Sequence, residues 1–119
     1  MSVELALGEL VKKSLGELER AILATPDGVL VAASNPSDID DIVSALGAAV
    51  VAGVGEAFQQ YFSTGVRDVL VELKDSRVVL MREIGGLVLC LISKPKPNLG
   101  LIYYLLDKYT DKIAASVKK

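Results

Sequence analysis

The sequence contains no histidine and a single cysteine, and these two shortages exclude several kinds of catalytic site. Ser-His-Asp and Cys-His arrangements need an imidazole, as do histidine-ligated metal sites. Cys90 has no partner for an intrachain disulfide, which agrees with a reducing compartment. It lies in an apolar run, where a thiol usually serves as a small hydrophobic side chain. We therefore expect no enzyme activity, no metal and no cofactor.

Long uncharged runs and basic stripes are also missing. The longest uncharged stretch, residues 42–55, has 14 residues, whereas a membrane span needs about 20. The N-terminus carries acidic residues where a signal peptide would carry basic ones, and the net charge is −2. We expect a cytoplasmic protein with no membrane span and no nucleic-acid partner. The P-loop pattern is absent, so the chain is not itself a P-loop GTPase.

Aromatic residues are scarce as well, at 5%, although 51% of the chain is hydrophobic. Aliphatic side chains must therefore form the core of what we expect to be one domain, residues 1–119. The aliphatic content is high for a soluble chain of this size. A self-association surface would account for the excess.

Hydrophobic periodicity and turn residues predict the element order α-β-β-α-β-β-β-α. Thr25-Pro26-Asp27-Gly28 has the composition of a tight turn between the first two strands. Two-residue connections make the last three strands antiparallel neighbours. Asn98 is the expected N-cap of the final helix. The expected helices cover residues 3–14, 37–62 and 98–117, and the expected strands cover residues 18–25, 28–34, 66–74, 77–83 and 87–93.

The long helix, with Ser37 as its expected N-cap, is apolar on more than one face. At 100° per residue it carries two stripes. We expect the first stripe to cover the sheet: Ile39, Ile42, Val43, Leu46, Val50, Gly53, Ala57 and Tyr61. The second stripe then needs a cover from elsewhere: Ser44, Gly47, Val51, Val54, Phe58 and Phe62. A second copy of the protein, or another helix of the same chain, could supply it.

The strand expected at residues 66–74 begins the meander, so it can lie at the edge of the sheet. It alternates evenly, with Val69, Val71 and Leu73 on one face, and it contains no proline. Such an edge is a template for pairing with another chain. Pairing through this strand would also bring two long helices together.

Four stretches together resemble the Roadblock family, which includes dynein light chains, bacterial gliding-motility regulators and subunits of lysosomal small-GTPase scaffolds. They are ERAILATPDGVLVAAS, DIDDIVSALGAAVVAGVGEAF, SRVVLMREIGGLVLCLIS and PNLGLIYYLLDK. The resemblance covers roughly residues 15–117. It implies an α+β fold with one five-stranded, mostly antiparallel sheet in the order 2-1-5-4-3. The central helix would cover one face and the terminal helices the other.

The resemblance also implies a homodimer, or a heterodimer with a paralogue, joined through the third strand and the central helices. Prokaryotic relatives of this kind bind Ras-like small GTPases, so we expect a non-enzymatic scaffold or regulator of such a GTPase. Two alternatives stay open: a light-chain-type subunit of a motor or sensory complex, and a small-ligand sensor. The expected dimer interface comprises Ser44, Gly47, Val51, Val54, Gly55, Phe58, Phe62, Arg67, Val69, Val71 and Leu73.

Overall fold

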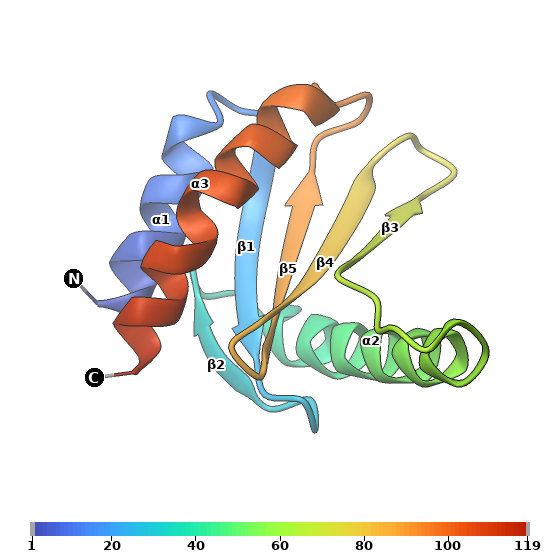
Figure 1. The fold of residues 1–119 in the computed structure, drawn as a ribbon. Coiled ribbons are helices and arrows are strands. Elements are labelled where there is room, and N and C mark those ends of the chain that lie inside the picture. The colour runs from blue at the N-terminus through green and yellow to red at the C-terminus, as the bar shows by residue number, and fades with distance from the viewer. Residues whose placement is uncertain (1, 119) are drawn as a thin grey trace.

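A computed structural model describes residues 2–118 of the chain. Its elements follow the predicted order of helices and strands (Figure 1). Their bounds are α1 Val3–Lys13, β1 Leu18–Ala24, β2 Leu30–Ala33, α2 Asp40–Phe62, β3 Asp68–Glu72, β4 Val78–Ile84, β5 Leu87–Ser93 and α3 Leu99–Val117. The last strand has the predicted bounds, whereas β2 and β3 are shorter than predicted because their ends diverge into turns.

The five strands form one sheet in the order β2-β1-β5-β4-β3, and every neighbouring pair is antiparallel. The fold predicted from the sequence is therefore confirmed. β5 lies in the middle of the sheet, paired with β1 and β4, and residues 88–93 are buried. This position explains why the strand has no polar alternation: both of its faces are covered. β3 lies at the edge, as predicted.

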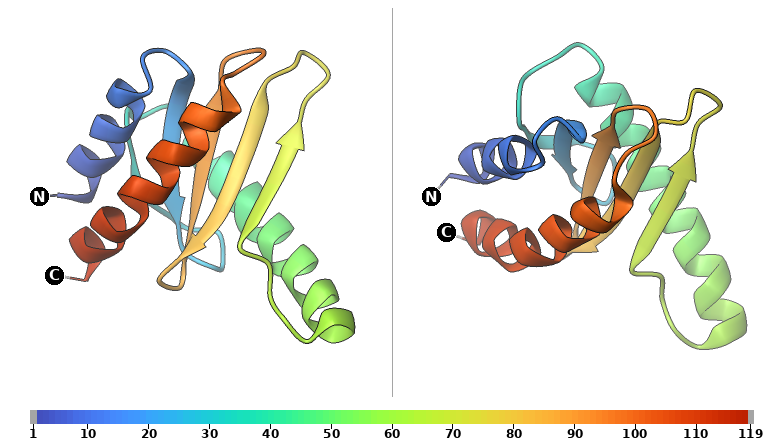
Figure 2. Two further views of the ribbon diagram at one scale, coloured as in Figure 1. Left: turned by 45° about the horizontal axis from the view of Figure 1, so that its top comes forward. Right: turned by 90° about the horizontal axis from the view of Figure 1, so that it is seen from above.

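Helices cover both faces of the sheet, as Figure 2 shows. α1 and α3 lie side by side on one face, where the larger core includes Leu7, Leu89, Leu106 and Ile113. α2 crosses the other face, where a smaller core contains Ile22, Met81 and Cys90. The smaller core leaves part of this second face without cover.

Local sequence signals account for the turns and for one helix start. Gly28 has a φ of +90° and donates its N–H to the Thr25 carbonyl at 3.0 Å, which confirms the predicted turn. Gly85 and Gly86 both have positive φ between β4 and β5, as a two-residue hairpin turn requires. Asn98 accepts a hydrogen bond from the Leu101 N–H at 3.1 Å and so caps α3.

The predicted N-cap of α2 is wrong. Ile39, not Ser37, occupies the cap position, and no side chain bonds to the first free N–H groups there. Asp40 instead turns its carboxylate back to accept the Ser37 N–H at 2.8 Å and to pair with Arg20 of β1 at 3.2 Å. This long-range ion pair fixes where the helix begins.

Candidate interaction surface

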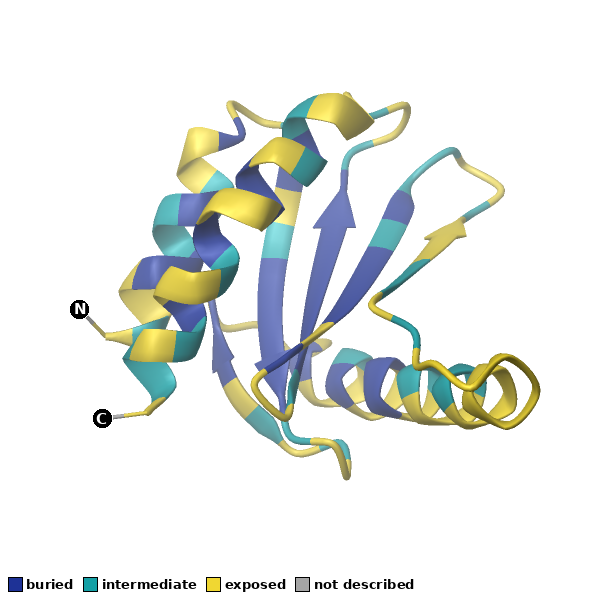
Figure 3. Ribbon diagram, viewed as in Figure 1, coloured by how far each residue is buried: buried dark blue, intermediate teal, exposed yellow. Residues whose placement is uncertain are grey.

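α2 leaves much of its apolar surface exposed. Figure 3 shows that the buried part of the helix lies toward its N-terminal end and that exposed residues dominate the rest. The exposed fractions of Ile42, Leu46 and Phe62 are 63%, 60% and 67%. Monomeric soluble proteins rarely leave large contiguous apolar patches open, so this surface is a candidate site for contact with another molecule.

The side of α2 that faces the sheet falls between the two predicted stripes, because Val43 and Val50 of the first stripe and Val51 of the second pack against the smaller core. Ser44, Gly47 and Ala48 are buried against the sheet, whereas Ile42 and Leu46 of the first stripe are largely exposed. Small side chains let the helix axis come close to the sheet, and a methyl group at Gly47 would overlap the Cys90 Sγ atom. Ile39 and Tyr61, also expected to cover the sheet, are exposed. Ser44 and Gly47 therefore offer no surface to another chain, and we remove them from the expected interface.

The stripe that begins at Ser44 and Gly47 continues along α2 after the helix has passed the sheet. In Figures 1 and 2 the C-terminal half of α2 projects beyond the β3 edge. Val54, Phe58 and Phe62 lie at the same helical angle as the buried positions. The rings of Phe58 and Phe62 stack with centroids 5.4 Å apart, and Phe58 is still 47% exposed. The stripe is buried where the sheet lies beneath it and is open where the sheet ends.

β3 presents a free backbone edge next to this overhang. It pairs with β4 on one side, and the other side has no neighbour among residues 2–118. The Leu73 N–H donates to the Arg77 carbonyl at 2.8 Å. Since N–H directions alternate along a strand, the N–H groups of Leu70 and Glu72 point away from β4. Two backbone donors are thus available for another strand.

An apolar groove of about 220 Å³ lies between one flank of α2 and the β3 end of the sheet. Leu46 and Val50 form its helix wall, Val71 and Leu73 form its β3 wall, and Met81 forms part of its floor. Its lining contains no polar side chain. Val69, Val71 and Leu73 all face the α2 side of the sheet, which confirms the prediction that they share one face of the strand.

A buried arginine holds the edge strand in place. Arg82 of β4 donates to both carboxylate oxygens of Asp68, at 2.6 and 2.9 Å. Its Nη1 reaches Asp107 at 2.9 Å and Thr110 at 3.0 Å, both on α3. These hydrogen bonds outweigh the effect of burial, so the pKa of Asp68 is lowered and the pKa of Arg82 is raised. The network connects the edge strand to the helix on the opposite face, and the sequence analysis did not predict it.

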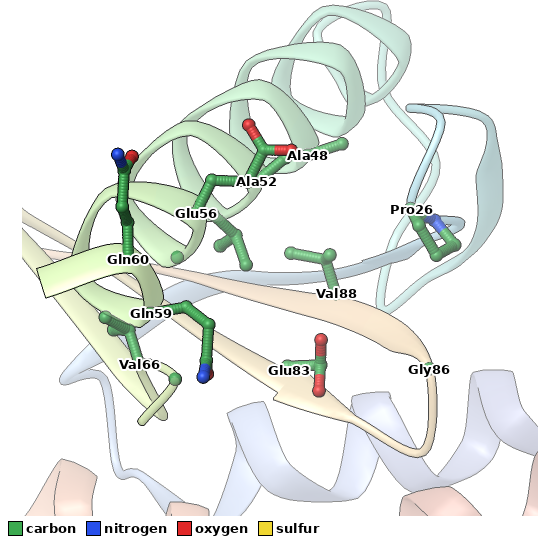
Figure 4. A pocket seen from close by; sticks show the side chains of 13 residues that line it. Pro26, Ala48, Ala52, Glu56, Gln59, Gln60, Val66, Glu83, Gly86 and Val88 are labelled. Atoms are coloured by element: carbon green, nitrogen blue, oxygen red, sulfur yellow. The ribbon is translucent and has the colours of Figure 1, made fainter. Parts of the chain in front are cut away.

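A second pocket, of about 520 Å³, opens on the other flank of α2 (Figure 4). Val51 and Gly55 contribute to its wall, together with Glu56 and Gln59. The opposite side is closed by Glu83 of β4 and by Gly86 of the turn between β4 and β5. Val51 and Gly55 therefore line the side of the stripe away from the β3 groove, and Val51 also packs against the smaller core.

The predicted interface residues thus fall into four groups, of which Ser44 with Gly47 and Val51 with Gly55 have been described. Val54, Phe58 and Phe62 lie together on the overhanging part of α2. Val69, Val71 and Leu73 lie at the sheet edge next to Arg67, which is exposed and forms an ion pair with Asp68 at 3.4 Å. The sequence analysis missed Leu46 and Leu70 as exposed apolar residues. The small residues at positions 44, 47 and 48 mark the side of the helix that approaches the sheet, so they could have indicated that Leu46 lies outside.

The exposed part of α2 and the groove beside β3 present mainly aliphatic and aromatic side chains. The Cys90 thiol is buried, and burial raises its pKa to about 11, so it stays protonated at neutral pH. Among residues 2–118, no group of three or more His, Cys, Asp or Glu side chains is placed to hold a metal ion. Within the same range, α2 is the one helix long and apolar enough to cross a membrane, although its N-terminal half packs on the sheet.

Comparisons with known proteins agree with this geometry. The Roadblock/LC7 domain model matches residues 4–93. A Roadblock/LC7 domain structure from Streptomyces avermitilis is 18% identical, with a TM-score of 0.89 and full coverage of both chains. MglB from Myxococcus xanthus is 19% identical, with a TM-score of 0.85, over 98% of this chain and 94% of that one.

A third structure, described as MglB with a tetrameric arrangement, is 14% identical with a TM-score of 0.79, over 99% of this chain and 92% of that one. No curated protein matches the sequence. The structural likenesses establish the fold, and the match to the family model extends over most of the chain. The chain belongs to the Roadblock/LC7 domain family.

Proposed function

We propose that the protein is a non-enzymatic, dimeric interaction module that acts as a scaffold or regulator of a Ras-like small GTPase. One observation supports the dimer above all: the apolar stripe of α2 continues past the edge of its own sheet and is exposed there. An overhanging helix beside a free strand edge suits a partner that continues the same sheet. A second copy of the chain offers such a continuation.

Pairing β3 with β3 of a second copy about a two-fold axis would extend the sheet through the free N–H groups of Leu70 and Glu72. Such an interface is isologous, so each contact occurs twice. The overhanging Val54, Phe58 and Phe62 of each copy would then lie over the other copy's sheet. The apolar groove between Leu46 and Val71 is on the side that the second α2 would cross.

This arrangement gives a revised interface that follows the structure. Gly53 lies on the open flank of α2, and a Cβ there would have nothing within 4 Å, so its own chain does not require a glycine. A glycine in a helix costs about 1 kcal/mol relative to alanine, and close approach of a second helix would explain it. The proposed interface comprises Leu46, Val50, Gly53, Val54, Phe58, Tyr61, Phe62, Arg67, Val69, Leu70, Val71 and Leu73.

The proposal that the partner is a GTPase is based on the family resemblance. The resemblance to gliding-motility regulators and GTPase scaffolds implies binding of a Ras-like protein, and MglB structures share this fold. A dimer without catalytic groups would act by holding surfaces of the GTPase in one conformation. The test is affinity purification from extract of the source cells, with identification of the bound proteins. Recovery of a Ras-like GTPase supports the proposal, and recovery of specific partners without any GTPase contradicts it.

The dimer has its own test. Sedimentation at micromolar concentration should give a species of twice the 12.6 kDa chain mass. A species of 12.6 kDa alone would contradict the proposal. Because α2 is apolar enough to suggest a membrane, flotation with phospholipid vesicles is the companion measurement. A dimer should stay with the soluble fraction, since its α2 surface is covered.

A further inference from the structure

The pocket on the far flank of α2 is a separate feature from the proposed dimer interface. Its volume of about 520 Å³ lies within the range of pockets that hold ligands or anchoring side chains. It is bounded by α2 on one side and by β4, β5 and their turn on the other (Figure 4). The groove beside Val71 and Leu73 lies on the opposite flank of the helix. Gly65 and Val66 of the pocket lead into β3, but none of the lining residues belongs to the proposed dimer interface.

The charged groups of the pocket are all of one sign. Glu56 stands on the helix wall and Glu83 on the strand wall, and the lining contains no Lys or Arg. Both glutamates are exposed, and within residues 2–118 neither has a cation within ion-pair distance. Two unpaired carboxylates at one pocket make the local potential negative, which favours a positively charged group there.

The end of α2 adds to this preference. Gln59 and Gly65 belong to the same lining, where the last carbonyl groups of the helix carry partial negative charge. The last turn of α2 contains no basic residue to compensate for it. Figure 4 shows the Gln59 side chain projecting from α2 at the pocket, and its amide oxygen is one more acceptor.

The remaining lining is apolar and suits a long aliphatic stem. Val51, Val66 and Val88 line the pocket beside the acidic groups. Arginine and lysine bury their methylene stems on apolar surface while their charged ends stay near polar groups. A guanidinium, with five donors in a planar fork, matches carboxylate and amide acceptors placed on two walls.

We propose that this pocket binds an arginine or lysine side chain presented by a protein partner. The proposal does not depend on dimerisation or on the identity of the GTPase. It gives the module a second contact surface, one that selects partners by charge, whereas the β3 side selects by apolar fit and strand pairing. Such a division allows a dimer to hold a further protein without opening its own interface.

The test uses acetyl-Leu-Arg-Leu-amide as the probe and follows the methyl NMR signals of Val51, Val66 and Val88 in the full chain. The matched probe replaces arginine with citrulline, which keeps the shape and removes the charge. We expect the arginine peptide to shift these signals and to bind at least about tenfold more tightly than the citrulline peptide. Equal shifts with both peptides, or none with either, would overturn the proposal.

Two variants locate the binding. Glu56→Gln/Glu83→Gln keeps the shape of the pocket and should weaken the arginine peptide by about tenfold or more. Glu4→Gln/Glu19→Gln removes two exposed charges elsewhere and should leave its affinity unchanged. Gly55→Met should block the pocket without a clash at the backbone, since a Cβ at Gly55 meets nothing within 4 Å. If binding survives both pocket variants, the site is wrong.

A free cation is the competing occupant, and 1,4-diaminobutane is its probe. If the diamine shifts the three valines at lower concentration than the arginine peptide, the pocket is a small-cation site and the peptide proposal fails. Sedimentation of the same variants separates this result from the dimer. The variants should keep the wild-type association state, because neither Glu56 nor Glu83 nor Gly55 is among the proposed interface residues.

Discussion

Gly47 of α2 lies directly against Cys90 of β5, with no room between them for a methyl group. The contact sets how closely the helix approaches the middle of the sheet. It also fixes the rotation of α2 about its axis, because only the side that carries Ser44, Gly47 and Ala48 is small enough to face the strands. The bulky residues of α2 consequently point to the flanks.

Gly47→Ala should therefore destabilise the fold. Overpacking of a tight contact costs about 1–3 kcal/mol, and here it opposes the small gain from helix propensity. Urea unfolding at a fixed protein concentration measures the loss. Cys90→Ala in the same chain should restore part of it, since the smaller side chain leaves space for the new methyl group.

Gly55→Ala is the matched control for that change, because Gly55 is outside the proposed dimer interface. Its added methyl group meets nothing within 4 Å, so the folded chain should be as stable as before or more stable by up to about 1 kcal/mol. If Gly47→Ala and Gly55→Ala had the same effect on unfolding, the proposed contact with Cys90 would not be what positions α2.

The Cys90 thiol should be unreactive in the folded protein. Burial raises its pKa from 9.0 to about 11, so the thiolate fraction at pH 8 falls about a hundredfold relative to the unfolded chain. Labelling with Ellman's reagent should be slower by at least that factor in buffer than in guanidinium chloride. Because the pKa is raised on folding, the contribution of the protonated thiol to the free energy of unfolding is fully present below pH 9. It is lost as the pH rises toward 11. Equal labelling rates would contradict the buried position of the thiol.

Asp68→Asn should loosen the edge strand. The carboxylate accepts two hydrogen bonds from buried Arg82, and the amide can satisfy only part of that network. We expect a loss of about 1–3 kcal/mol at pH 7, measured by urea unfolding. Because Arg82 lowers the pKa of Asp68, the wild-type contribution is present above the ordinary carboxyl pKa of 3.8 and is lost as the pH falls below it.

The variant should consequently lose less stability than the wild type between pH 5 and pH 2. Asp75→Asn is the control, since its ion pair with Arg77 lies at an exposed turn. A larger loss from Asp75→Asn than from Asp68→Asn would show that the Arg82 network does not hold the edge. Deuterium exchange of the β3 amides gives an independent measure of the same effect.

Local signals determined much of the fold, because turns and caps depend on residues close in sequence. The Thr25–Gly28 turn, the Asn98 cap and the apolar β5 could all be predicted in this way. The start of α2 could not be predicted in this way, because the Asp40 carboxylate forms an ion pair with Arg20, twenty positions earlier in the chain. A helical wheel likewise gives the angles between residues but not the rotation of the helix against its sheet.

That limit explains the error in the candidate interface. The helical wheel shows two apolar stripes of similar size, so it does not determine which side of α2 faces the sheet. In the structure the side with the smallest residues faces the sheet, because it allows the closest approach. Val54, Phe58 and Phe62 remain part of the proposed interface because the same stripe passes beyond the sheet. Whether a second copy covers them is a prediction, which two further changes address.

Phe62→Glu should weaken self-association without unfolding the chain. The side chain is 67% exposed, so a charge costs the single chain little, but it would be buried in the proposed dimer. Leu5→Glu on α1 is the matched control, because Leu5 is 66% exposed and lies away from β3. Sedimentation should show monomers for Phe62→Glu and the wild-type state for Leu5→Glu. Equal behaviour of the two variants would rule out the overhang as the contact.

Leu70→Pro tests strand pairing separately from the helix contact. Its N–H points away from β4, so proline removes an outward donor and keeps the ladder inside the sheet. Val71→Pro is the contrast, because its N–H faces β4 and its loss should destabilise the single chain. We expect Leu70→Pro to stay folded by circular dichroism and to sediment as a monomer. A Leu70→Pro chain that stays folded and self-associates as the wild type does would mean that the edge of β3 takes no part in association. The remaining route for two copies to meet would then be helix against helix, and Phe62→Glu would be the variant that still separates them.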